Sequence, residues 1–185
     1  MPICIIVPEA FSIPECDQII EMGMHLDSSA GRVKNKGTNY GELDASVREC
    51  SLTWLPPENL SFDWIYGRLA KLMNFANKSW DFDLNGETEH IQFTHYLPGN
   101  FFDWHIDLGE KETSTRKLTC VIQLSKPDAY IGGDLQLNIN NAKSVPRDCG
   151  TAIIFPTFVL HRVTNIEQGE RFTLVSWANG KRSFR

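Results

Sequence analysis

Two segments in the first half of the chain carry apolar residues at the spacing of an amphipathic helix. In FSIPECDQIIEMGMHL, apolar or small residues recur every three or four positions, and Ser12 with Glu15 forms an S-x-x-E capping box. A second set with the same spacing follows two consecutive prolines, which break a helix. The pattern predicts helices at about 13–26 and about 61–78.

From Glu89 onward the pattern changes to short runs rich in β-branched and aromatic residues, separated by clusters of Pro, Gly, Asn and Asp. The runs are HIQFTHY, RKLTCVIQLS, GDLQLNI, GTAIIFP, FVLHRVTNI and ERFTLVSWA. This spacing predicts a sandwich or barrel of antiparallel strands. Helices followed by many strands argue against a doubly wound α/β fold. We therefore expect a mainly β fold of the α+β class with flanking N-terminal helices.

The length of 185 residues fits one domain, so we expect a single domain over 1–185. Its N-terminal part, about 1–85, should be helical and loop, and its β core should cover about 86–185. The stretch at about 28–50 is polar, rich in glycine and without a sustained period, which predicts a long loop.

Charge and hydropathy indicate which classes of binding partner the sequence disfavours. The 18 basic residues are outnumbered by 23 acidic ones and are scattered along the chain, which disfavours nucleic acid as a partner. The N-terminus lacks a basic leader, and no apolar run approaches the length of a membrane span. We expect a soluble, cytoplasmic protein that binds no membrane.

Candidate metal ligands occur in GNFFDWHIDLG, where His105 and Asp107 lie two positions apart. A strand would place both side chains on one face, about 7 Å apart at roughly 3.3 Å per residue. Asp103, two residues before His105, would lie on the same face and is therefore also a possible ligand. An H-x-D pair alone is weak because it is common in proteins. His161, in an otherwise apolar strand, is the best third ligand, although a core histidine bonded to a backbone carbonyl fits that position too. His95 is the main rival.

Two histidines and one carboxylate form the facial triad of non-haem Fe(II) oxygenases, and zinc hydrolases use a similar set. Arg171 opens the run ERFTLVSWA, and alternation places it on one strand face with Trp177. If that face looks inward, the guanidinium requires an anion such as a carboxylate. If it looks outward, Arg171 would pair with Glu167 or Glu170.

The run RKLTCVIQLS has two different faces. Thr119, Val121 and Gln123 form a face that mixes apolar and hydrogen-bonding groups, while the other face is apolar. A mixed face suits a pocket for a small polar molecule, and it also suits a half-exposed outer surface.

Taken together, the residues resemble the Fe(II)- and 2-oxoglutarate-dependent dioxygenases, specifically the prolyl-4-hydroxylase-like branch. The resemblance covers most of the chain. It rests on the ordered set Tyr96, His105-x-Asp107, R-x-L-T at 116–119, Gly132-Gly133, His161 and Arg171. It implies a double-stranded β-helix, or jelly roll, as the core.

The resemblance also implies the roles of individual residues. It implies that Fe(II) is bound by His105, Asp107 and His161, and that 2-oxoglutarate chelates the metal and meets Arg171 at its distal carboxylate. The resemblance also places three residues in the cosubstrate pocket, namely Tyr96, Gln123 and Thr119. It places Trp177 on the substrate side of the iron.

The implied activity is hydroxylation of an unactivated C–H bond, with O₂ as oxidant and decarboxylation of 2-oxoglutarate to succinate and CO₂. Ascorbate is a further candidate cofactor. A peptidyl proline is the first substrate candidate, which makes a peptide or protein the expected partner, and the loop at about 28–50 matches a region that closes over peptides in prolyl hydroxylases. The alternatives are a lysyl residue, a free amino acid or another small molecule as substrate, a non-catalytic jelly-roll binding module, and a zinc hydrolase.

Overall fold

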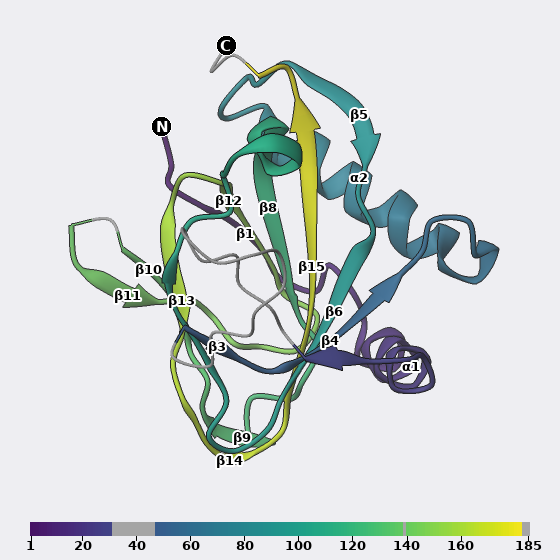
Figure 1. Ribbon diagram of the computed structural model, residues 1–185, viewed down its shortest axis with the longest axis vertical. Coiled ribbons are helices and arrows are strands. Elements are labelled where there is room, and N and C mark those ends of the chain that lie inside the picture. Colours follow the sequence, from purple (N-terminus) through teal and green to yellow (C-terminus); the bar gives the residue numbers. More distant parts are fainter. Residues whose placement is uncertain (31–46, 139, 183–185) are drawn as a thin grey trace.

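The computed structural model describes residues 1–30, 47–138 and 140–182, which form two facing antiparallel sheets (Figure 1). The major sheet has the order β1-β12-β8-β15-β6-β4-β2, with β5 also paired to β15. Its strands are β1 (Ile5–Val7), β2 (Ser29–Ala30), β4 (Ser51–Leu55), β5 (Leu84–Thr88), β6 (Ile91–Tyr96), β8 (Arg116–Gln123), β12 (Ala152–Pro156) and β15 (Arg171–Gly180).

The minor sheet faces the major one and has the order β11-β10-β13-β7-β3. Its strands are β3 (Arg48–Glu49), β7 (Phe101–His105), β10 (Leu135–Asn138), β11 (Ala142–Ser144) and β13 (Leu160–Val163). A separate pair is formed by β9 (Tyr130–Gly132) and β14 (Ile166–Gly169). The predicted mainly β fold with a jelly-roll core is confirmed.

Two helices pack against the major sheet and form a hydrophobic core with its outer face. The first is α1 (Ile13–Met24), which begins at the predicted capping box: the Ser12 N–H donates to Glu15 Oε2 at 2.7 Å. The second is α2 (Asp63–Asn77), preceded by a short 3₁₀ turn, η1 (Leu60–Phe62). Both helices lie where the periodicity predicts them. No helix among the described residues is long and apolar enough to cross a membrane.

Each of the six predicted β runs contains a strand, but the N-terminal part differs from the expectation of helix and loop only. It contributes β1 to β4, because short edge segments there pair with strands of the core. The predicted loop at about 28–50 is partly strand, since its two ends form β2 and β3. Residues 31–46 of that loop lie outside the described residues, so its role stays a prediction.

The major sheet has two buried faces. On β8 and β15, every second side chain packs under the helices, including Ile122 and Leu174. The residues between them look into the space between the two sheets, where Val121 and Phe155 belong to a second hydrophobic core. The polar side chains of this inner face are buried as well, and they form the wall of the candidate site.

Candidate metal centre

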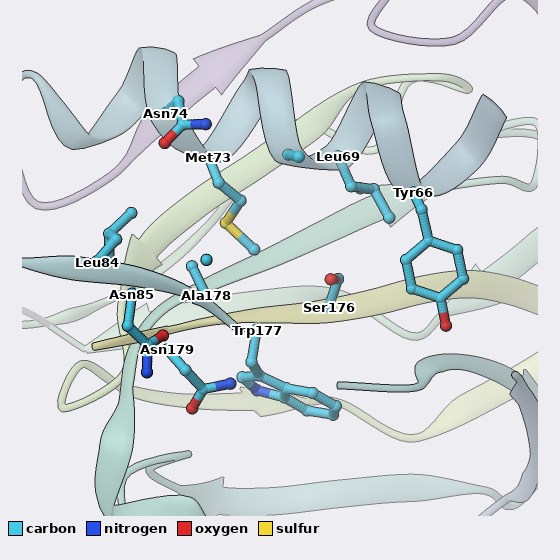
Figure 2. Close-up of a pocket in the computed structure, with 12 residues that line it drawn as sticks. Tyr66, Leu69, Met73, Asn74, Leu84, Asn85, Ser176, Trp177, Ala178 and Asn179 are labelled. Carbon is cyan, nitrogen blue, oxygen red and sulfur yellow. The ribbon is translucent and has the colours of Figure 1, made fainter. Parts of the chain in front are cut away.

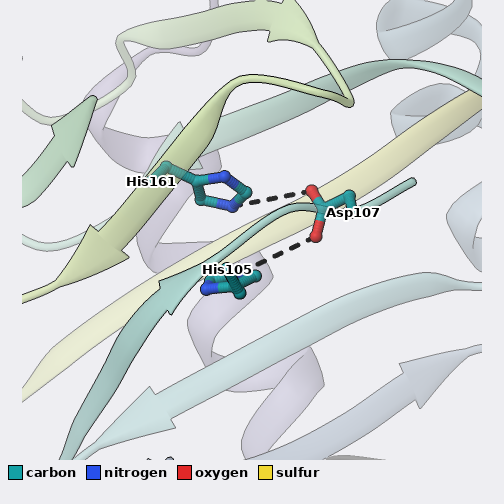
Figure 3. A group of neighbouring side chains, drawn as sticks. All are labelled: His105, Asp107 and His161. Carbon is teal, nitrogen blue, oxygen red and sulfur yellow. Dashed lines mark ion pairs between the residues drawn. The ribbon is translucent and has the colours of Figure 1, made fainter. Parts of the chain in front are cut away.

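Strand pairing in the minor sheet brings the two candidate histidines together. His105 is the last residue of β7 and lies directly opposite His161 of β13 in the register of the sheet. Figure 3 shows both imidazoles turned toward Asp107. The ligand atoms of the three residues all lie within 4.8 Å of one another. They therefore form a cluster that can hold one metal ion.

Asp107 reaches this cluster from a turn and not from a strand. Because β7 ends at His105, the strand-parity argument for the H-x-D pair is wrong in this detail. The backbone N–H of Asp107 donates to Thr157 O at 2.9 Å, which ties the turn to the segment before His161. Asp103, which parity also admitted, is exposed, and its carboxylate accepts from the Trp104 N–H at 2.7 Å.

Backbone carbonyls select the tautomer of both histidines. Nδ1 of His105 lies 2.7 Å from Asp103 O, and Nδ1 of His161 lies 2.9 Å from Val159 O. A proton on each Nδ1 leaves the Nε2 lone pair free for a metal. These Nε2 atoms lie 3.7 and 3.6 Å from the two oxygens of Asp107 (Figure 3).

The charge states also suit a cation. Burial lowers the pKa of His105 to about 3, and the neighbouring His161 adds to this effect. Burial raises the pKa of Asp107, but His161, His105 and a hydrogen bond from Thr119 oppose burial and leave the pKa below its usual value. At neutral pH the site therefore presents a neutral His105 and an ionised Asp107, which are the forms that bind a metal.

Two residues of the inner sheet face support Asp107. Thr119 Oγ1 donates to Asp107 Oδ2 at 2.6 Å, so Thr119, expected in the cosubstrate pocket, contacts a candidate metal ligand here. The indole N–H of Trp177 is buried without a well-formed hydrogen bond to the described residues, yet it lies close enough to lower the pKa of Asp107. The guanidinium carbon of Arg116 lies 3.7 Å from the Trp177 ring centroid, and Arg116 is paired with Glu89.

Arg171 lies on the inner face, as the inward-facing alternative requires. It is 1% exposed, and its Nη2 donates to Gln123 Oε1 at 3.0 Å. Its Nε has no hydrogen-bond partner, and none of the described carboxylates pairs with it. Tyr96 lies opposite Arg171 in the sheet, and its ring centroid is 5.3 Å from the guanidinium carbon. A buried guanidinium without an anion fits the carboxylate of a bound molecule.

The side chain of His95, the rival candidate ligand, lies on the face of β6 opposite to that of Tyr96. Its Nε2 is 2.8 Å from Glu170 Oε2, and its ring stacks on Phe172 at 4.3 Å. Glu170 is therefore occupied by His95, which also removes it as a partner of Arg171. His95 is not part of the cluster with His105.

Sequence reasoning missed Arg48, which it assigned to the long loop. Arg48 lies in β3 and is 7% exposed. Its guanidinium carbon is 4.4 Å from the Phe102 ring centroid, and Phe102 stacks on His105 at 3.4 Å. The alternation of Arg48 with the buried Cys50 and Leu52 was the signal that could have found it.

A cavity of about 410 Å³ lies between α2, β5 and β15. Figure 2 shows Ser176 and Ala178 directed toward α2, whereas Trp177 and Asn179 lie on the opposite side of β15. The lining includes Leu69 and Met73 but none of the three candidate ligands. Trp177, which lies close to Asp107, also lines this cavity, so the cavity borders the candidate metal centre without including its ligands.

A profile described as the 2OG-Fe(II) oxygenase superfamily matches residues 91–179. A PKHD-type hydroxylase of Prochlorococcus marinus (strain MIT 9211) is 31% identical over 97 residues, which cover 52% of this chain and 44% of that protein. The match thus spans less than half the length of this relative.

Solved structures share the fold over nearly the whole chain. A Pseudomonas putida prolyl-4-hydroxylase is 17% identical, with a TM-score of 0.71, and the match covers 97% of this chain and 93% of that one. A Trichoplax adhaerens prolyl hydroxylase, in complex with a hypoxia inducible factor peptide fragment, is 14% identical with a TM-score of 0.77, covering 96% and 83%. The matched segment, residues 91–179, contains all three candidate ligands, so the part of the chain that carries the candidate metal centre is similar to the 2OG-Fe(II) oxygenase superfamily.

Proposed function

We propose that this chain is an Fe(II)- and 2-oxoglutarate-dependent hydroxylase that acts on a peptidyl proline. One observation carries the proposal: His105, Asp107 and His161 converge within 4.8 Å, with both Nε2 atoms directed at the carboxylate. The buried Arg171, which lacks an anion among the described residues, supports an anionic cosubstrate nearby.

The residues present fit the metal and the cosubstrate. Imidazole nitrogens and a carboxylate suit Fe(II), and a three-residue set leaves positions open for other ligands. Arg171 would hold a carboxylate of 2-oxoglutarate, beside Gln123 and Tyr96. When bound, Fe(II), 2-oxoglutarate and O₂ supply oxidative decarboxylation to succinate and CO₂, coupled to hydroxylation of the substrate.

The side chains of this chain orient and insulate that chemistry. Asp107 is the one anionic ligand, and the Thr119 hydroxyl fixes one of its oxygens. The two backbone carbonyls that accept from Nδ1 prevent either imidazole from rotating. Burial raises the pKa of Tyr96 to about 12, so its phenol stays protonated at neutral pH and can donate a hydrogen bond. The surrounding apolar side chains exclude water, which strengthens each of these contacts.

The choice of a peptidyl proline is supported by the structural neighbours named prolyl hydroxylases, one of which holds a peptide. A lysyl residue or a free amino acid are the competing substrates of the same chemistry. The single domain, the cytoplasmic location, the absence of nucleic acid and membrane partners, and the use of ascorbate stay predictions from the sequence.

The experiment incubates the purified protein with Fe(II), 2-oxoglutarate and ascorbate, and measures succinate with proline-containing, lysine-containing and control peptides. We expect succinate in step with addition of one oxygen atom to a proline-containing peptide. Turnover with lysine peptides alone would overturn the proline assignment and leave the reaction class intact. Failure to bind 2-oxoglutarate, together with no succinate, would overturn the proposed function.

A charge-reversal variant tests the cosubstrate site directly. Arg171→Glu should abolish measurable 2-oxoglutarate binding and leave Fe(II) binding in place, because it replaces a cation with an anion at the carboxylate position. Equal loss of both ligands would instead mean that Arg171 supports the fold.

A further inference from the structure

Arg48 extends from the edge of the minor sheet into the space between the sheets. Its strand β3 pairs with β7, with Arg48 opposite Phe102, and the Asp103 N–H donates to Val47 O at 2.8 Å. This pairing fixes the backbone beside the strand that carries His105. At 7% exposure, the Arg48 side chain is buried almost as fully as Arg171.

The described partners of Arg48 are neutral. Its Nε–H donates to Cys50 Sγ at 3.1 Å, and sulfur is a weak acceptor. Burial raises the pKa of Cys50, so the thiol is protonated at neutral pH. The Phe102 ring offers only a cation–π contact, at 4.4 Å from the guanidinium carbon.

Arg48 and Arg171 lie in opposite sheets but near the same two side chains. Arg48 belongs to the minor sheet and Arg171 to the major sheet, and both lie close enough to Cys50 and Tyr96 to oppose the rise in their pKa values. Arg48 lies on the side of Phe102 and His105, whereas Arg171 lies beside Gln123.

Burying a guanidinium is costly unless an anion or several good acceptors accompany it. Within the described part of the chain, neither Arg48 nor Arg171 pairs with a carboxylate. The partly buried carboxylate of Asp107 is engaged by Thr119 and the two histidines. Among the described residues, the space between the sheets therefore contains two guanidinium groups without an anionic partner, and a bound molecule could supply the anions.

We propose that Arg48 is a second cosubstrate-binding residue, so that the dicarboxylate 2-oxoglutarate lies between the guanidinium groups of Arg48 and Arg171. This inference rests on the proposed function. A dicarboxylate supplies two anionic groups, which matches the two guanidinium groups in number. Arg48 would add affinity and select anionic cosubstrates over neutral 2-oxo acids of similar length.

The test measures the equilibrium dissociation constant of 2-oxoglutarate by calorimetry on Fe(II)-loaded protein without O₂. Arg48→Gln should raise this constant roughly 10- to 100-fold, the loss expected for one hydrogen-bonded charge pair. Arg48→Lys should give a smaller rise, because an ammonium keeps the charge but not the planar fork. Fe(II) affinity should not change.

Arg162→Gln is the matched control. Arg162 also stacks on an aromatic ring, at 4.6 Å from Trp104, and also bonds a neutral side chain, Gln136. It neighbours His161 in β13, so its side chain points to the other face of the minor sheet. This variant should bind 2-oxoglutarate like the wild type.

The possible outcomes separate this inference from the proposed function. If the wild type binds 2-oxoglutarate and Arg171→Glu does not, an unchanged constant in Arg48→Gln overturns the role of Arg48 alone. If the wild type itself fails to bind 2-oxoglutarate, the proposed function fails. Should Arg48→Gln not fold, as judged by its thermal unfolding, Arg48→Lys decides: weaker binding supports the proposal, and unchanged binding overturns it.

Discussion

The two faces of β8 and β15 are equally buried but chemically opposite. Ile122 and Leu174, on the face under the helices, are fully buried in an apolar core. Thr119 and Arg171, on the face between the sheets, are 0% and 1% exposed. A core without a ligand would not bury a guanidinium that lacks an anionic partner, because a buried charge costs free energy unless it is paired.

The difference shows which face serves the fold and which serves a ligand. The outer face packs mainly against the apolar side chains of the helices. On the inner face, Thr119 donates to Asp107, while Arg171 Nε and Trp177 Nε1 have no hydrogen-bond partner among the described residues. Substitutions on the two faces should therefore separate stability from ligand binding.

The largest effect is expected at Asp107, the proposed anionic metal ligand. Asp107→Ala should lower Fe(II) affinity by more than about 100-fold, since even the outer partners of metal ligands contribute 10- to 100-fold. Equilibrium dialysis against Fe(II) without O₂ measures this. The control is Asp103→Asn, which keeps the backbone carbonyl that orients His105 and should bind Fe(II) normally. Equal losses in the two variants would contradict the assignment of Asp107.

On the outer face, Ile122→Ala should lower the free energy of unfolding by about 2–5 kcal/mol, because it leaves a cavity in a closely packed core. Urea unfolding measures the change. At temperatures where the variant is folded, its Fe(II) affinity should match the wild type. A variant that is as stable as the wild type but binds metal poorly would mean that the two faces are not independent.

On the inner face, Thr119→Val should keep the shape of the side chain and remove the hydrogen bond to Asp107. We expect Fe(II) affinity to fall about 10-fold, with a smaller stability change than in Ile122→Ala. Thr94→Val is the control, because Thr94 is equally buried but accepts from Gln92, away from the metal ligands. A loss of Fe(II) affinity as large in Thr94→Val would remove the special role of Thr119.

A further expected effect is a pH dependence of the stability of the metal-free protein. The pKa of His105 is about 3 in the folded state and about 6.5 in an unfolded chain, so the unfolded state binds more protons between these values. Unfolding free energy should therefore fall as the pH drops from 6.5 toward 3. Asp107, whose pKa is also lowered, adds to the loss below about pH 4.

Thermal unfolding of the metal-free protein at a series of pH values measures this dependence. His105→Asn should flatten it, because asparagine does not titrate. A curve of the same steepness in this variant would assign the pH dependence to other groups.

The pattern of apolar and polar residues predicted the structure correctly where neighbouring residues alone determine it. The capping box at Ser12 predicted the start of α1, and alternation predicted both faces of β8. The same reasoning placed Arg171 correctly on a face with Trp177, but it could not decide whether that face looked inward.

Local pattern failed where tertiary pairing sets the structure. Asp107 reaches the site because its N–H bonds Thr157, fifty residues along the chain, and not because a strand continues to it. Arg48 lies in a polar stretch whose loop-like composition hid a two-residue strand paired with β7. The sequence favours His161 as the third ligand over its rival His95, and the arrangement of the sheets then separates the two residues in space.

The sequence by itself determined which residue types are available and how they alternate, because helix and strand periods depend on near neighbours. It was thus sufficient to predict the helices and the β core, while the candidate ligand set came from the resemblance to the dioxygenase family. Only the tertiary structure decided which ligands meet, that Arg171 faces inward and that Arg48 joins it. Contacts between distant segments depend on sheet register and on how the two sheets face each other, and neither is encoded in any single stretch of the chain.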